Sequence, residues 1–244
     1  DMKTKVYYLI VILIISLCSI STMATVYTVS NNYLDVGQFN SLYDAHNAAL
    51  DGDTIYLCSS LKSYTGINFT KKIVVLGIGF NKVNDESDVA KIDGTIYFKD
   101  GSQGSTISSI TGNFNIEVSA DNITIQRNKL KSITVYENIK NTFIVNNILR
   151  NENCDRNVII LKENSNTFIY NNIIFGCQVG YWNNSSTDFA VNNICILTSG
   201  FSSVILKNNI IQGSKSVYGY EKSEIYFFNN FISCAYYGGY ENIN

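Results

Sequence analysis

Five short triplets recur through the second half of the chain, and their side chains are of the kind that bind sugars. Each combines an aromatic or basic residue with carboxylate or amide side chains. Aromatic rings pack against the apolar face of a sugar, and carboxylates and amides exchange hydrogen bonds with its hydroxyls. The candidate residues lie in Tyr136-Glu137-Asn138, Lys162-Glu163-Asn164, Trp182-Asn183-Asn184, Tyr220-Glu221-Lys222 and Tyr240-Glu241-Asn242.

If these triplets stack along one face, they form a lateral stripe on which a long polysaccharide can lie. The alternative is that they are ordinary polar strand ends that enter turns. Stacked carboxylates allow a further chemistry, because Glu221 and Glu241 on neighbouring coils would stand about 4.8 Å apart and repel unless an ion intervenes. Ca²⁺ is therefore an alternative occupant, and we expect no other cofactor.

The elements that would position the triplets follow from a repeat of short apolar runs, each with an asparagine step. The copies read TIQRNKL, FIVNNIL, FIYNNII, FAVNNIC, ILKNNII and YFFNNFI. Their last asparagines are separated by 19, 25, 21, 16 and 21 residues. A period near 20 with variable insertions indicates a solenoid. The aligned asparagines are Asn128, Asn147, Asn172, Asn193, Asn209 and Asn230.

Around every aligned asparagine, the residue three positions before it and the residue two positions after it are apolar. The residue two positions before it is sometimes polar and sometimes apolar. This alternation predicts strand, turn, strand in each copy. Asparagine suits the turn because it tolerates the left-handed backbone conformation, and stacked amides can hydrogen-bond from coil to coil as a ladder. A register built on the first asparagine of each pair is the alternative, but only the second brings Asn128 into line. The apolar columns are Ile125, Ile144, Ile169, Ala190, Leu206 and Phe227, and Leu130, Leu149, Ile174, Cys195, Ile211 and Ile232.

A helix is predicted before the repeats, over Gln38 to Leu50. Its apolar residues have helical spacing, Asn40 or Ser41 can cap its start, and Gly52 can end it. An amphipathic helix there would cover the open end of the solenoid, which otherwise exposes strand edges. A strand over 54–57 follows. His46, the one histidine, is expected to be structural or solvent-facing rather than catalytic.

The order VYTVSNN, amphipathic helix, DGDTIYL and KKIVVLGIG, together with the asparagine repeats, resembles secreted right-handed parallel β-helix proteins of the pectate-lyase-like superfamily, above all those of Bacteroidetes. The resemblance implies an all-β fold: a single-stranded right-handed parallel β-helix, a solenoid with an N-terminal capping α-helix. It also implies that the asparagine ladder lies at a bend between two sheets. These motifs concern architecture rather than a reaction.

The N-terminal segment is typical of export. Lys3 and Lys5 precede an uncharged run over 6–20, and small residues follow at 22–24. We therefore expect a signal peptide over 2–24, a cap over 25–65, and coils over 66–244 that are truncated at the C-terminus. The protein would be secreted or held on the outer cell surface, with no stable membrane insertion after cleavage; a retained anchor or lipidation at Cys18 are the alternatives.

Composition narrows the partners and bonds. A net charge of −2 argues against nucleic acid as a partner. Cysteines after Cys18 are odd in number and have no close pair, so neither a metal knuckle nor a full disulfide framework fits. Buried thiols, with Cys195 in an apolar column, are the expected role, and Cys154 with Cys177 is the best disulfide candidate. Asp51 and Asp53 are expected to shape a turn rather than bind Ca²⁺.

Enzymes of the resembled superfamily need charged clusters that this chain does not match in pattern. The resemblance implies an arginine base with an acidic Ca²⁺ cluster in lyases, or several aspartates with a histidine motif in hydrolases. Asp155 and Asp188 stand apart, and no paired-aspartate motif is present. We assign no catalytic residue and expect non-catalytic binding of a glycan or a surface. The alternatives are a polysaccharide lyase, using Lys162 with Glu163, or glycoside hydrolase, and a structural stalk.

Overall fold

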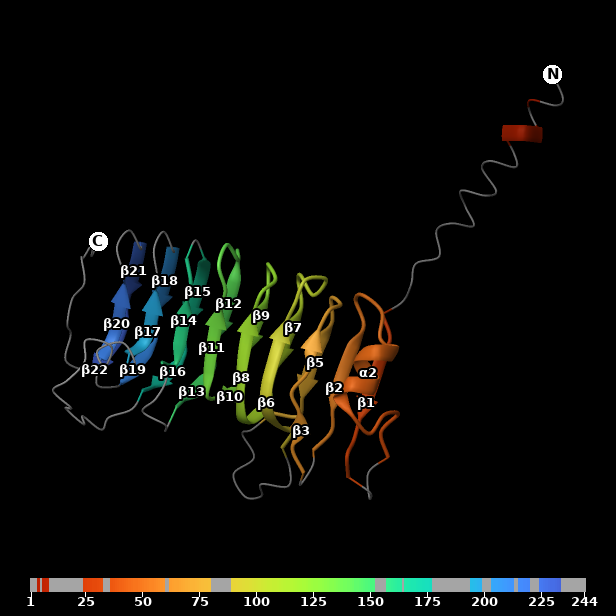
Figure 1. Cartoon of the computed structure of the whole chain (residues 1–244), viewed down its shortest axis with the longest axis horizontal. Helices are drawn as coiled ribbons and strands as arrows, with labels where there is room; N and C mark the ends of the chain where they lie inside the picture. Colours follow the sequence, from red (N-terminus) through yellow and green to blue (C-terminus); the bar gives the residue numbers. More distant parts are fainter. Residues whose placement is uncertain are drawn as a thin grey trace.

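The chain forms a right-handed parallel β-helix capped by a short helix (Figure 1). The structure, a computed structural model, describes residues 4, 6–8, 24–32, 36–59, 62–79, 89–151, 157–163, 165–176, 194–198, 203–212, 215–219 and 224–233. One sheet has nine parallel strands whose spatial order follows the sequence. They are β1 (Val26–Val29), β2 (Thr54–Leu57), β5 (Val74–Gly77), β7 (Thr106–Ser108), β9 (Thr124–Gln126), β12 (Thr142–Val145), β15 (Asn166–Tyr170), β18 (Ser203–Lys207) and β21 (Glu224–Phe228).

The second sheet has thirteen strands and wraps around the other faces of the coils. In the early coils the long strands β6 (Lys91–Phe98) and β8 (Thr111–Val118) span two faces, and β3 (Tyr64–Thr65) and β4 (Asn68–Phe69) pair with β6. β8 pairs with one short strand at its start and with another along its second half. The first stack is β10 (Lys129–Leu130), β13 (Ile148–Arg150), β16 (Ile173–Phe175), β19 (Ile210–Gln212) and β22 (Phe231–Ser233); the second is β11 (Ser132–Val135), β14 (Ile159–Leu161), β17 (Ile194–Thr198) and β20 (Lys215–Gly219).

Aliphatic side chains fill the interior in columns that run along the helix axis. Ile125, Ile144, Ile169 and Leu206 are fully buried, as the repeat predicts. Successive residues of a strand point to opposite faces, so each strand contributes alternate residues to the core. Burying one such side chain contributes roughly 1.5 to 3 kcal/mol. The same holds for the second predicted column, in which Leu130, Leu149, Ile174 and Ile211 are buried.

The cap helix is shorter than the expected segment. α2 (Leu42–Ala48) begins after Ser41, whose hydroxyl accepts the backbone N–H of Asp44 at 3.1 Å. The chain before it is held extended, because Phe39 forms a parallel bridge with Val29 of β1. α2 lies against β1 and β2 at the N-terminal end of the solenoid (Figure 1). β1 and β2, which α2 covers, belong to the nine-stranded sheet.

In the asparagine pairs, one residue makes the bend and the other forms the interior ladder, whereas we expected one residue to do both. The first member of each pair takes the left-handed conformation, with φ between 52° and 56°. The second member points into the interior. The expectation that the aligned asparagine itself makes the bend was wrong, because one side chain cannot serve a solvent-facing bend and an interior column. The bend residues are Arg127, Asn146, Asn171, Asn208 and Asn229.

The interior members form a continuous hydrogen-bonded column, here called the asparagine column: Asn128, Asn147, Asn172, Asn209 and Asn230. Each Nδ2 donates to the Oδ1 of the next member, at 3.2, 3.1, 3.1 and 2.9 Å in order. Each Oδ1 beyond the first member also accepts the backbone N–H of the preceding member. The first four are at most 1% exposed, so the column gives partners to amides that would be costly to bury unpaired.

Asn193 does not stand between Asn172 and Asn209, because those two side chains are bonded directly to each other. It lies outside the described residues. One long coil therefore replaces the two coils that the spacing had suggested. Cys195 likewise leaves its expected column, since the strand that follows β16 is β19, and β17 pairs with β14 instead. Cys154, Cys177 and Ala190 are outside the described residues.

Candidate functional site

The first two triplets meet on the outer face of the second sheet. Tyr136 directly follows β11 and Lys162 directly follows β14, and the two strands are paired so that Val135 stands beside Leu161. The next residues of both coils therefore lie side by side. The ammonium of Lys162 lies 3.9 Å from the centroid of the Tyr136 ring. A cation over a phenol ring is a favourable contact, stronger as water is excluded.

Tyr136 also reaches back to the preceding coil. Its hydroxyl donates a 2.7 Å hydrogen bond to Oε2 of Glu117, which faces outward from β8. This bond to a carboxylate is the main cause that raises the pKa of Tyr136; partial burial and the negative charge of Glu117 act in the same direction. Glu117 thus holds the phenol in its neutral, donating form and fixes the ring between two coils.

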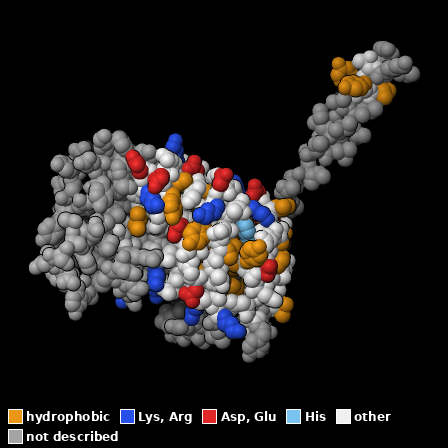
Figure 2. Space-filling model, viewed as in Figure 1, with side chains coloured by type: hydrophobic (Ala, Val, Ile, Leu, Met, Phe, Trp, Pro, Cys, Tyr) orange, Lys and Arg blue, Asp and Glu red, His pale blue; other side chains and the backbone are white. Residues whose placement is uncertain are grey.

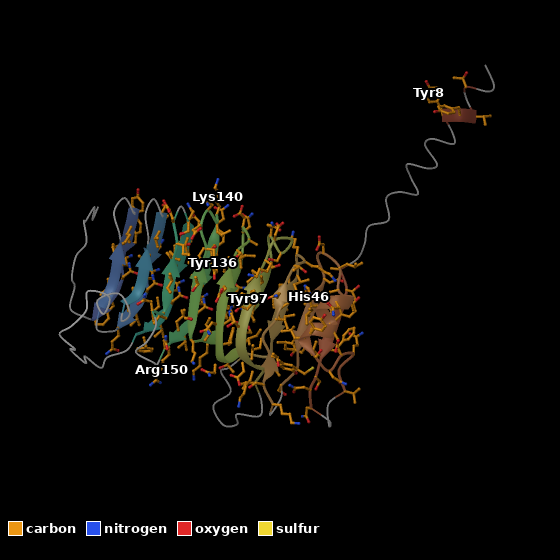
Figure 3. All side chains as sticks on the ribbon, in the orientation of Figure 1. Tyr8, His46, Tyr97, Tyr136, Lys140 and Arg150 are labelled. Atoms are coloured by element: carbon orange, nitrogen blue, oxygen red, sulfur yellow. The ribbon has the colours of Figure 1, made fainter. Side chains whose placement is uncertain are left out.

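Residues of earlier coils extend the same face. Tyr97 of β6 is the strand partner of Glu117, and Lys99 lies with its ammonium 4.8 Å from the centroid of the Tyr97 ring. Two residues earlier along the strands, the hydroxyl of Ser132 donates to Oδ1 of Asn115 at 2.7 Å. Tyr97 and Tyr136 lie on the same side of the middle coils in Figure 3. We call this face the polar face: Tyr97, Lys99, Asn115, Glu117, Ser132, Tyr136 and Lys162.

Five of these polar-face residues are new candidates that the triplet search missed: Tyr97, Lys99, Asn115 and Glu117 in or beside β6 and β8, and Ser132 of β11. The search covered the coils that carry the asparagine repeat, whereas β6 and β8 belong to coils without it. A signal was present, because apolar and polar residues alternate in the stretches TIYF and NFNIEV. That alternation puts Tyr97, Asn115 and Glu117 on the outward side of their strands.

The carboxylates of the first two triplets lie beyond the polar face. Glu137 and Glu163 are both exposed, and the chain turns there: Asn138 has a φ of 62° and its backbone N–H donates to the carbonyl of Glu163. Both carboxylates are open to solvent. They stand at the margin of the site.

The later triplets fall outside the described residues. These are Trp182 with Asn183, Tyr220 with Glu221, and Tyr240 with Glu241. In the described strands, β14 pairs with β17, and Leu161 stands beside Thr198.

The outer face of the nine-stranded sheet differs from the polar face. Phe143 and Phe168 are stacked with their ring centroids 4.8 Å apart and their planes 10° from parallel. Tyr170 meets Phe168 edge to face. Rings stacked along the axis cover one another's faces and present their edges outward. This arrangement stabilises neighbouring coils and leaves little ring face for a sugar.

Neither a metal cluster nor a spanning helix is found in the described part of the chain. There, no three His, Cys, Asp or Glu side chains lie close enough to hold a metal ion. Asp53 accepts the backbone N–H groups of Thr25 and Leu50, and Asp51 accepts that of Lys72, so both shape the turn after α2. No helix within the same residues is long and apolar enough to cross a membrane.

The polar face can exchange hydrogen bonds with a hydroxyl-rich ligand at several points. Carboxylate, ammonium, amide and phenol groups lie on adjacent coils, about 4.8 Å apart. Basic and acidic side chains are interspersed over this side of the middle coils rather than gathered by sign (Figure 2).

Comparison with known proteins yields one structural likeness. No protein family matches this chain, and no curated protein matches its sequence. The crystal structure of the pectate lyase Pel9A is similar over 92% of this chain and 80% of that chain, at 14% sequence identity and a TM-score of 0.36. At this level the likeness carries nothing about activity, so function rests on the residues of the polar face.

Proposed function

We propose that this protein binds a polysaccharide or cell-surface glycan, without catalysis, through the polar face. The observation that carries the proposal is the linked set of Lys162, Tyr136 and Glu117, which joins three successive coils. Its donors and acceptors are held in place before any ligand arrives. A preorganised surface loses less side-chain entropy on binding, which favours affinity for a flexible chain such as a polysaccharide.

The dimensions of the face suit an extended ligand. The groups repeat at the coil spacing, so a chain that lies along the helix axis meets a new donor or acceptor about every 4.8 Å. Tyr97 and Tyr136 are half-buried and combine a ring with a hydroxyl, a pairing that suits the apolar and polar sides of a sugar. The outer face of the nine-stranded sheet, with its stacked Phe143 and Phe168, does not combine rings with charged groups in this way. These points support a glycan rather than an apolar partner.

Export supports the same reading. The basic residues and uncharged run at the N-terminus are the signal of a secreted or surface protein, where polysaccharides are the abundant partners. We also infer that binding needs no cofactor. Ca²⁺ held by Glu221 and Glu241 is the alternative, and both residues lie outside the described part of the chain.

Binding to a panel of plant, algal and bacterial polysaccharides, measured by affinity electrophoresis and then titration calorimetry, tests the proposal. We expect Tyr136→Ala and Tyr97→Ala each to weaken binding about five- to tenfold, because each removes a contact worth about 1 to 1.5 kcal/mol. Tyr170→Ala on the opposite sheet is the matched control and should leave binding unchanged. Equal losses in all three variants, or none in Tyr136→Ala, would contradict the proposed site.

The same panel separates the alternatives. A lyase would release unsaturated sugars that absorb in the ultraviolet. If that signal appeared and was lost in Lys162→Ala, the function would be catalysis rather than binding. Binding that disappears with a chelator and returns with Ca²⁺ would replace the cofactor-free site by a calcium-dependent one. A folded protein that neither binds nor cleaves any member of the panel would favour the structural stalk.

A further inference from the structure

His46 connects the cap helix to the coil beneath it through a hydrogen bond that requires a neutral imidazole. The side chain lies in α2 and is 5% exposed. Its Nε2 accepts the backbone N–H of Thr70, which follows β4, at 3.2 Å. The ring also meets Phe69 edge to face, with centroids 5.4 Å apart, and Phe69 is stacked on Phe98. The imidazole is therefore a link between α2 and the first aromatic layer of the core.

Lys71 places a positive charge beside this link. Its ammonium donates to the carbonyl oxygens of His46, Asn47 and Ala49, at 2.9, 2.9 and 2.7 Å. Carbonyls at the end of a helix have no partners within the helix and carry partial negative charge, so an ammonium there stabilises α2. The same ammonium repels a proton on His46. Burial and this charge, in that order, lower the pKa of His46 from its ordinary 6.5.

The other ionisable groups of the elements around His46 do not offset that charge. In α2, Asp44 is exposed and accepts a hydrogen bond from Ser41. After α2, Asp51 and Asp53 accept backbone N–H groups. Their charges do not appear among the causes that shift His46. The titratable side chains of the two strands packed against α2 are phenols: Tyr27 of β1 and Tyr56 of β2.

We propose that His46 makes the N-terminal cap acid-labile: when the imidazole takes up a proton, α2 separates from the first coils while the rest of the β-helix stays folded. A protonated Nε2 carries a hydrogen and can no longer accept the N–H of Thr70, so the hydrogen bond is lost and two donors face each other. The charged ring would also be buried beside Lys71. Opening the cap exposes Leu42 and Ala45, which are now buried, and Phe69 beneath them.

The direction of the pH effect follows from linkage. A group whose pKa is lowered by folding binds fewer protons in the closed state than in the open state. The closed cap is therefore fully favoured above pH 6.5 and loses stability as the pH falls below it, until the lowered pKa is reached. Over that window the equilibrium constant for opening rises by up to about tenfold per pH unit.

Two measurements on the intact chain test this device. Because the chain has one histidine, its imidazole resonance can be followed without ambiguity between pH 8 and pH 5. We expect a midpoint below 6.5. Hydrogen exchange, corrected for the intrinsic pH dependence of amide exchange, should show residues 42–48 losing protection over the same range, while β8 retains its protection.

His46→Gln is the matched variant, since its amide oxygen can accept from Thr70 but does not titrate. Its α2 should keep a pH-independent level of protection from pH 8 to pH 5. A midpoint at or above 6.5 would overturn the proposal. So would the same acid loss of α2 protection in His46→Gln, or loss of protection in β8 together with α2. The resonance titration uses the unaltered chain, so it decides the matter even if the variant folds poorly.

Discussion

Replacing Asn147 by alanine should destabilise the β-helix far more than changing its neighbour Asn146. The side chain of Asn147 makes four interior hydrogen bonds. Its Oδ1 accepts from the backbone N–H and the Nδ2 of Asn128, and its Nδ2 donates to Asn172 and to the carbonyl of Ile125. Alanine removes all four and leaves the buried N–H of Asn128 with no acceptor from this side chain.

The magnitude follows from which groups keep a partner. Asn128 Nδ2 still donates to the carbonyl of Ile107, and Asn172 Oδ1 still accepts the backbone N–H of residue 147. The N–H of Asn128 and the carbonyl of Ile125 lose their side-chain partners. At about 1 to 3 kcal/mol for each of these two buried groups, the free energy of unfolding should fall by about 2 to 6 kcal/mol.

Urea unfolding followed by far-UV circular dichroism measures this difference. The matched control is Asn146→Gly, because Asn146 is exposed and has a φ of 56°, which glycine adopts readily. Its effect should be about 1 kcal/mol or less. Comparable losses for Asn147→Ala and Asn146→Gly, at an unchanged denaturant slope, would refute the division of roles between the two asparagines.

Three further predictions test other parts of the fold. Thr142→Val and Thr167→Val should each raise the free energy of unfolding by about 1 kcal/mol in urea melts, because both hydroxyls are buried without a partner; a loss of stability would contradict this. Arg127→Gly should raise the free energy of unfolding by about 0.5 to 1 kcal/mol, because Arg127 is exposed and its φ of 54° is strained for a residue other than glycine. A lower urea midpoint for this variant would contradict the presence of strain at Arg127. The hydrogen bond of Tyr136 contributes stability that is present below pH 10.0 and is lost as the pH rises through its raised pKa. Because Glu117 is the main cause of that shift, Glu117→Gln should lower the pKa of Tyr136, measured by phenolate absorbance with Tyr136→Phe as the reference. An unchanged pKa would mean that the carboxylate of Glu117 does not set it.

Much of the fold can be predicted from the sequence because local and long-range patterns agree. The strand over 54–57 was expected with these bounds, and Ser41 was one of two expected caps for the helix. The apolar columns around Asn128 and Asn147 could be identified because inward positions tolerate only apolar residues, so each copy repeats the same constraint. Alignment on the second asparagine also gave the members of the asparagine column that the structure joins.

Coil length could not be predicted in the same way. The motif around Asn193 matches the repeat locally, yet the strand after it pairs with β14 and not with β16. Which strand stacks on which depends on the pairing of backbones between coils, and a seven-residue pattern does not determine that pairing. Similarly, the sequence of an asparagine pair does not determine which member bends the chain, since either asparagine can adopt a positive φ.

The polar face was predicted only in part, for a related reason. Tyr136 and Lys162 were found because they follow strands in coils with the repeat. Glu117 was missed, although it holds the hydroxyl of Tyr136, because the contact joins coils whose register is known only from the pairing of β8 with β11. Side-chain chemistry on a solenoid is readable along a strand, but across coils it depends on the register.

A double-mutant cycle between Asn172 and Asn209 tests most directly the claim that a column of amides sets the register of the coils. The two side chains are joined by a 3.1 Å hydrogen bond, and the backbone N–H of Asn172 also donates to Oδ1 of Asn209. The account predicts a coupling energy of roughly 0.5 to 3 kcal/mol between Asn172→Ala and Asn209→Ala. Additive effects of these two substitutions would contradict it.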